Sequence, residues 1–185
     1  VDNTFAVLSR ESILNSLDDL LADTTIVRIP YEHLQSVKKV GSGASGSVTH
    51  SKWHNIDKLT KIEVIYDVAV KELHWYPRSN YESAELTSFI SEINLCSKLV
   101  HPNITRFIGI CITGENILLL SEYMQNGAVS TVLELKAKEF TAAMRYKVLL
   151  DAATGMKYLH ARNIIHRDLK VYFYVNIHLL ALVYL

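Results

Sequence analysis

The sequence predicts an α+β fold in which a β-rich first part is followed by a helical second part. Two observations support this prediction. The stretches at residues 47–53 and 62–70 are rich in strand-forming residues and follow a glycine-rich loop. Residues 141–160 instead show a long apolar stripe at helical spacing, formed by Met144, Val148, Leu149, Ala152, Ala153, Met156 and Leu159. We therefore expect strands to dominate the first part of the chain and helix the part after it.

The composition excludes several functional classes. The chain has 185 residues, of which 19 are basic and 19 acidic, so no global field favours nucleic acid or an anionic membrane as a partner. Cys96 and Cys111 have neither disulfide-type nor metal-type spacing. The histidines at positions 33, 50, 54, 74, 101 and 160 show no ligand spacing either, and we interpret them as surface or hydrogen-bonded core residues rather than metal ligands. A reducing, cytoplasmic location fits these features.

The first 28 residues are predicted to be a linker with a short helical pattern. Ile13, Leu17 and Leu20 recur at helical spacing among polar residues. The segment is either a docking or regulatory element or a lead-in helix that frays into a linker.

A glycine-rich stretch occupies residues 41–48. Glycines at this spacing allow the backbone to approach phosphate groups closely. A dinucleotide-binding turn has the same glycine pattern, and Asp67 lies at a tolerable distance for it. Such a turn must open a helix, whereas residues 47–53 are β-rich, so we favour a hairpin. The candidate nucleotide-binding residues in this stretch are Gly41, Ser42, Gly43, Ala44, Ser45, Gly46 and Val48.

Lys71 closes the apolar strand that ends in Ala69 and Val70. It is either an exposed strand end or an inward-facing ammonium group that would meet nucleotide phosphates. An inward charge needs a counter-ion. Glu92 falls on the apolar face of the next helical pattern, at residues 86–96, and is the candidate partner; the alternative is a solvated helical glutamate.

Residues 101–104 form a predicted turn, and two apolar runs follow it, at residues 107–112 and 117–120. Turn-forming residues between the runs predict an antiparallel hairpin. The next segment, residues 121–127, either connects a strand to a helix as a plain loop or binds a ligand through its backbone.

The segment after the predicted helix reads His166-Arg167-Asp168-Leu169-Lys170. With the glycine loop, Lys71, Glu92, the turn at 101–104 and the segment at 121–127, it forms an ordered series that resembles a eukaryotic protein kinase over about residues 31–170. Residues 28–31, which precede the domain, and the Tyr123-Met124 pair in the segment at 121–127 resemble the tyrosine-kinase-like group. Lys170 is similar to the lysine of kinases that phosphorylate serine or threonine.

The resemblance implies ATP and Mg2+ bound between a β-rich lobe (residues 29–124) and a helical lobe that begins at residues 125–170. Asp168 would act as the base and Lys170 would neutralise charge on the transferred group. Lys71 would hold the phosphates with Glu92 orienting it. The glycine loop, Val48 and Ala69 would cover the nucleotide, and Glu122 and Met124 would bind the adenine edge. The protein substrate is unknown.

The resemblance stops after Lys170. Five residues after the aspartate, the family has a magnesium-binding asparagine, and this chain has Phe173. No Asp-Phe-Gly follows. We therefore expect a truncated kinase fragment that is inactive alone, without metal ligands of its own. The alternative is a catalytically dead, kinase-like module that binds a nucleotide or a partner.

The tail at residues 171–185 is almost entirely apolar. It is shorter than the roughly 20 residues of a membrane-spanning helix, so a membrane anchor is the minor interpretation. The others are a buried strand or, as we favour, a non-kinase sequence introduced by a frame change, a retained intron or a truncated gene model.

Overall fold

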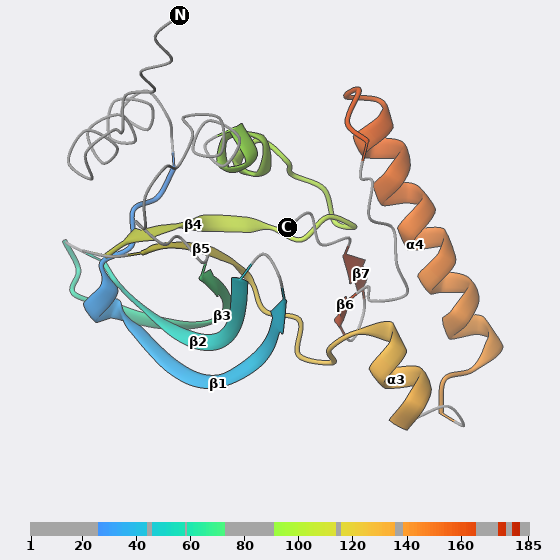
Figure 1. Ribbon diagram of the computed structural model, residues 1–185, viewed down its shortest axis with the longest axis horizontal. Helices are drawn as coiled ribbons and strands as arrows, with labels where there is room; N and C mark the ends of the chain where they lie inside the picture. Colours follow the sequence, from blue (N-terminus) through green and yellow to red (C-terminus); the bar gives the residue numbers. More distant parts are fainter. Residues whose placement is uncertain are drawn as a thin grey trace, which may run out of the picture. The chain divides into compact units, whose positions relative to one another are not determined.

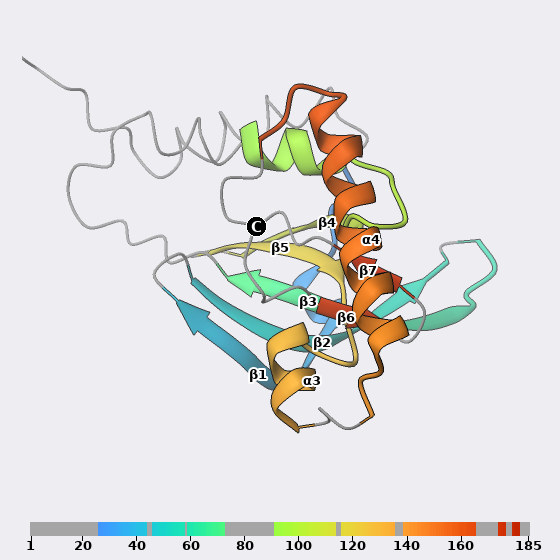
Figure 2. The same ribbon diagram turned by 90° about the vertical axis from the view of Figure 1, so that its right-hand side faces the viewer.

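Figures 1 and 2 show the computed structural model of the chain. The contacts between residues divide the chain into two compact units. The sheet unit consists of residues 1–98 and 107–121, and the helix unit consists of residues 99–106 and 122–185. The predicted N-terminal helical pattern lies outside the described residues. These are residues 26–43, 46–57, 59–72, 91–113, 116–135 and 139–165, with the backbone of 174–176 and 179–181.

The sheet unit contains a five-stranded sheet in the order β1-β2-β3-β5-β4. β1 pairs antiparallel with β2, β2 with β3, and β4 with β5. The predicted strand at residues 62–70 and the predicted hairpin of residues 107–120 are thus confirmed. The strands are β1 (Leu34–Gly43), β2 (Gly46–Ile56), β3 (Glu63–Glu72), β4 (Phe107–Ile112) and β5 (Ile117–Glu122).

The two faces of this sheet have different chemistry, because successive side chains of a strand point to opposite faces. Val68 and Val70 of β3 are 0% and 6% exposed and pack with Leu118 of β5. We call this side the back face. Lys71 and Leu119, the next residues along their strands, therefore lie on the other side, which we call the helix face.

A helix at residues 91–97 covers the helix face. Ile93 is fully buried and packs with Ile110, Ile117 and Leu119. Both views show this helix, drawn in green, alongside β4 and β5 (Figures 1 and 2). The predicted helix is confirmed over the described residues, and its earlier part lies outside them.

The segment before β1 is held against the edge strand β4. The amide of Ile29 donates to the carbonyl of Ile110 at 2.8 Å, and the amide of Ile110 donates to Val27 at 3.0 Å. These bonds flank a parallel bridge between Arg28 and Ile110. A single 3-10 turn, η1 (Tyr31–His33), then leads into β1. The segment therefore protects a sheet edge that would otherwise leave backbone groups unpaired.

The helix unit is built on α3 (Val129–Leu135) and α4 (Ala142–His160). The predicted helix at residues 141–160 is confirmed. Thr141 caps it, because its side chain accepts a hydrogen bond from the Met144 amide at 3.2 Å.

The apolar stripe of α4 is narrower than predicted. Ala152, Gly155 and Leu159 are buried, at helical spacing on one face. Met144 and Leu149 are 52% and 68% exposed, so their assignment to the buried stripe is wrong. Both lie at the margins of the stripe, where side chains point away from the helix face that carries Ala152, Gly155 and Leu159.

Two short strands follow in the tail. β6 (Tyr174–Asn176) and β7 (Leu179–Ala181) pair antiparallel as a two-stranded sheet. Over the part of the chain that the structure describes, no helix has the length and apolar character needed to cross a membrane.

Candidate functional site

The glycine stretch forms the end of the β1–β2 hairpin, which confirms the hairpin over the dinucleotide-binding turn. Gly41 pairs with Val48, Ser42 with Ser47 and Gly43 with Gly46. Two register shifts precede these pairs in β1. The predicted residues Ala44 and Ser45 lie outside the described residues.

Lys71 lies on β3, directly opposite Val48 of β2. Lys71 is only 6% exposed, so most of the residue is buried at the base of the glycine hairpin. Ala69 lies two residues earlier on the same strand and points to the same face. The structure therefore brings Val48, Ala69 and Lys71 together on the helix face of the sheet.

Glu92 and Lys71 both lie close to Cys96 of the helix. The pKa of the Cys96 thiol is raised to about 12, mainly because the thiol is buried; the Glu92 carboxylate contributes to the rise and the Lys71 ammonium group opposes it. Glu92 is half-buried. Lys71 and Glu92 both belong to the described residues, and no ion pair joins them there. Their pairing therefore stays a prediction.

A second cluster of charges lies on the same face, further along β2 and β3. His50 Nε2 lies 2.6 Å from Asp67 Oδ1, and Lys52 Nζ lies 3.6 Å from the same oxygen. The hydrogen bond from His50 lowers the pKa of Asp67 below its ordinary value. Sequence reasoning missed this cluster. His50 and Lys52 are two residues apart on one predicted strand, and Asp67 lies on the next. Opposite charges at such cross-strand positions are the sequence signal that could have indicated this cluster.

The predicted adenine-binding segment begins at the end of β5. Ser121 is 4% exposed and pairs with Phe107. The Glu122 amide donates to the Arg106 carbonyl at 3.0 Å, and the Arg106 amide donates to Glu122 Oε1 at 2.7 Å. Hydrogen bonds to Arg106 therefore hold both the backbone amide and the side-chain carboxylate of Glu122 in place.

Met124 follows in the helix unit and is 5% exposed. Its carbonyl accepts a hydrogen bond from the Gly127 amide at 3.1 Å. Gly127 has a φ of +70°, a conformation that glycine adopts with little strain. This turn ends the segment before α3.

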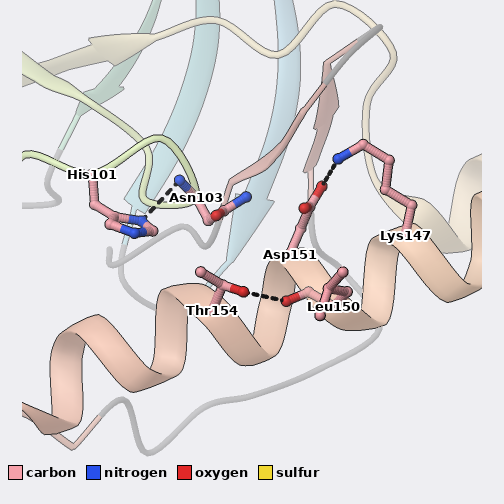
Figure 3. A network of polar contacts seen from close by, with 6 residues as sticks. All are labelled: His101, Asn103, Lys147, Leu150, Asp151 and Thr154. Carbon is pink, nitrogen blue, oxygen red and sulfur yellow. Dashed lines mark hydrogen bonds and ion pairs between the residues drawn. The ribbon is translucent and has the colours of Figure 1, made fainter.

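The turn at residues 101–104 is tied to α4, and Figure 3 shows the hydrogen bond within the turn, from the Asn103 amide to the His101 ring. The amide of Asn103 donates to His101 Nδ1, and the amide of Ile104 donates to the His101 carbonyl, both at 3.0 Å. The His101 ring lies 4.6 Å from the Tyr158 ring of α4. The Tyr158 hydroxyl accepts from the Val100 amide at 3.0 Å. The turn thus fixes one side of the helix that leads towards Asp168.

The predicted base Asp168 and its neighbour Lys170 lie outside the described residues. The structure follows the chain to Ile165, just before them. The Ile164 amide donates to the Leu159 carbonyl at 3.0 Å, and Ile164 packs against the cluster around Leu159.

Comparison with known proteins gives a family for this chain. The family model described as protein tyrosine and serine/threonine kinase matches residues 34–172. A serine/threonine-protein kinase/receptor of Acanthamoeba polyphaga mimivirus is 34% identical over 157 residues, which are 83% of this chain and 9% of that protein. Serine/threonine-protein kinase CTR1 of Arabidopsis thaliana is 30% identical over 146 residues, 77% of this chain and 16% of that protein.

A third relative, a serine/threonine-protein kinase of Dictyostelium discoideum, is 32% identical over 154 residues, 82% of this chain and 14% of that protein. This chain thus spans only a small part of the length of its curated relatives. The family match covers most of the sheet unit and α4, and the five-stranded sheet agrees with the β-rich lobe of a kinase domain. The chain belongs to the protein tyrosine and serine/threonine kinase family.

Proposed function

We propose that the family reaction of this protein is the transfer of a phosphoryl group from ATP to serine or threonine hydroxyls of a protein substrate, with at most residual transfer by the 185-residue chain alone. The observation that carries the proposal is the buried position of Lys71, opposite Val48 at the base of the glycine hairpin. A buried ammonium group is costly unless a negative charge compensates it. Nucleotide phosphates supply that charge.

The residues of the helix face fit a nucleotide. The backbone of Gly41, Ser42, Gly43 and Gly46 can approach phosphate oxygens closely because side chains are small or missing there. Val48 and Ala69 offer apolar surface to the base. In this proposal Ala44 and Ser45 complete the loop.

Other residues take supporting roles in the proposed reaction. Glu92 orients Lys71, and backbone groups of Glu122 and Met124 hold the edge of the adenine. Asp168 accepts the proton of the attacking hydroxyl, and Lys170 stabilises charge on the transferred group.

The residues present do not fit the magnesium ions that protein kinases use with ATP. Phe173 stands where the resemblance implies a metal-binding asparagine, and a phenyl ring offers no ligand atom. Within the described ranges, no group of three histidine, cysteine or acidic residues could hold a metal ion. No step of the proposed reaction is therefore assigned to the metal.

Phe173 also favours a second candidate function. Without metal ligands, phosphoryl transfer loses much of its charge stabilisation, whereas the helix face of the sheet still offers Lys71 to a nucleotide. The second candidate is a kinase-like module that binds a nucleotide or a partner and transfers nothing. In both cases we expect a cytoplasmic location, because Cys96 and Cys111 are not joined in a disulfide bond.

The substitution Lys71→Met tests the proposal. A fluorescent ATP analogue measures binding, and radiolabelled ATP with a generic protein substrate measures transfer. We expect Lys71→Met to weaken nucleotide binding about tenfold or more and to abolish transfer. Lys39→Met, which removes an exposed lysine of β1, is the matched control and should change neither.

The outcomes separate the two candidates. Transfer that Lys71→Met abolishes supports the kinase. Binding that is sensitive to Lys71→Met, with no transfer by the unaltered chain, supports the binding module. A chain that binds no nucleotide contradicts the kinase and the nucleotide-binding form of the module, and leaves only a module that binds a partner.

A further inference from the structure

A cavity of about 600 Å3 opens on the back face of the sheet, away from the candidate nucleotide site. Its wall is formed by β1, β2, β3 and the β4–β5 turn, all within the sheet unit. The volume lies in the range of small-molecule binding sites. We call it the back-face cavity.

The back-face cavity is distinct from the site around Lys71, although both use β3. Val70 and Glu72 line the cavity, and they flank Lys71 along the strand. Because side chains alternate, Val70 and Glu72 point to the back face while Lys71 points to the helix face. A ligand in the cavity would therefore contact none of the proposed nucleotide-binding side chains.

The floor of the cavity is apolar. Val70 and Leu118 are 6% and 7% exposed, and both belong to one buried cluster. Tyr31 of η1 also lines the cavity and is 61% exposed, so its ring is available to a ligand. These groups favour a ligand whose apolar part is a flat aromatic ring or a short aliphatic chain.

Among the residues described by the structure that line the cavity, Glu72 is the one with a charged side chain. Asn116 Nδ2 donates to Glu72 Oε1 at 2.7 Å. Asn116 is itself fixed, because its amide donates to Thr113 Oγ1 at 2.9 Å and its carbonyl accepts from the Thr113 amide at 2.9 Å. The carboxylate is thus held in place at the cavity wall. No hydrogen bond to its second oxygen is made by the described residues.

The remaining polar groups suit a ligand with few, well-placed donors. The hydroxyl groups of Ser36, Thr49 and Ser51 line the cavity on the β1–β2 side. Hydroxyl groups can donate or accept, so they tolerate several polar substituents. The described residues of the lining include no lysine, arginine or histidine, and so they favour a cation over an anion.

We propose that the back-face cavity is a second binding site, for a small amphipathic amine. The ammonium group of the ligand donates to Glu72, and its apolar body lies over Val70 and Leu118 beside the Tyr31 ring.

The test uses the full 185-residue chain and three probes of matched shape: phenethylamine, 2-phenylethanol and 3-phenylpropionate. Amide chemical shifts in a titration report both the affinity and the place of binding. We expect phenethylamine to bind with a Kd of about 1 mM and to shift the amides of Val70, Glu72 and Asn116. The neutral alcohol should bind about tenfold more weakly, and the anion should not bind.

Two variants remove one carboxylate each from the same strand. Glu72→Gln should weaken phenethylamine about tenfold and leave 2-phenylethanol unchanged. It should fold normally, because a glutamine carbonyl can still accept from Asn116. Asp67→Asn, on the helix face, is the matched control and should leave the affinity for phenethylamine unchanged.

Several results would overturn the proposal. Equal affinity for the amine and the alcohol would show that Glu72 does not select a cation. Equal weakening by Glu72→Gln and Asp67→Asn would show a general charge effect. Shifts confined to residues 41–48, or no shifts at 10-fold the expected Kd, would remove the site from the back face.

Discussion

Cys96 lies beside both charged residues of the candidate site, and its thiol has a pKa raised to about 12 from an ordinary value of 9.0. Burial is the main cause. The folded state therefore keeps a proton that the unfolded state loses between pH 9 and pH 12. We expect the free energy of unfolding to fall as the pH rises through this window.

Alkylation by iodoacetamide measures this effect, because only the thiolate reacts. In the variant Cys111→Ala, which leaves Cys96 as the single thiol, we expect native Cys96 to react about a hundredfold more slowly at pH 9 than the urea-unfolded chain. The rate in the native state should rise with a midpoint near pH 12. A native profile with its midpoint near pH 9 would contradict the shift.

Gly109 permits the close approach of the N-terminal segment to β4. A Cβ atom at this position would overlap the carbonyl oxygen of Val27, which is closer than any real contact. That carbonyl accepts the hydrogen bond from Ile110, so a side chain at position 109 must push the segment away.

We expect Gly109→Ala to lower the free energy of unfolding by about 1–3 kcal/mol, the usual cost of overpacking. Denaturant unfolding measures the change. Gly41→Ala is the control, since its added Cβ would meet no atom within 4 Å. Equal stability of Gly109→Ala and the unaltered chain would disprove the close approach.

At the scale of an element, Thr141 decides where α4 begins. The first amides of a helix have no partner within the helix, and the Thr141 side chain satisfies that of Met144. Thr141→Ala should destabilise the protein by about 1 kcal/mol, measured by denaturant unfolding. Thr141→Ser keeps the hydroxyl group and should cost much less. If both variants lose the same stability, the cap does not operate.

At the scale of the whole molecule, the buried clusters keep to one unit each. Ile93 and Leu120 belong to clusters of the sheet unit, while Ala152 and Leu159 belong to clusters of the helix unit. Each unit therefore has its own core, as expected of separate compact bodies.

Leu159→Ala should cost about 2–5 kcal/mol, because the side chain is fully buried. Native-state hydrogen exchange should then accelerate in α4 and leave the amides of β2 and β3 unchanged. Leu120→Ala, also fully buried, is the reciprocal variant and should accelerate exchange in the sheet. If each variant accelerates exchange throughout, the chain unfolds as one cooperative body.

Most strands of the sheet, the helix α4 and the kinase family were predictable from the sequence. The strand at residues 62–70, the hairpin of residues 107–120 and the helix at 141–160 were predictable because period-2 and period-3.6 patterns are local. The glycine hairpin was predictable because β-rich residues, not a helical stripe, follow it.

The tertiary structure decided which face of each element is buried and what lies against it. Alternation puts Val70 and Lys71 on opposite faces, but only long-range packing places one against a cavity and the other beside Cys96. The same holds for the exposure of Met144 on α4 and for the pairing of His50 with Asp67. These features depend on residues far apart in the chain, and no local pattern encodes their distance.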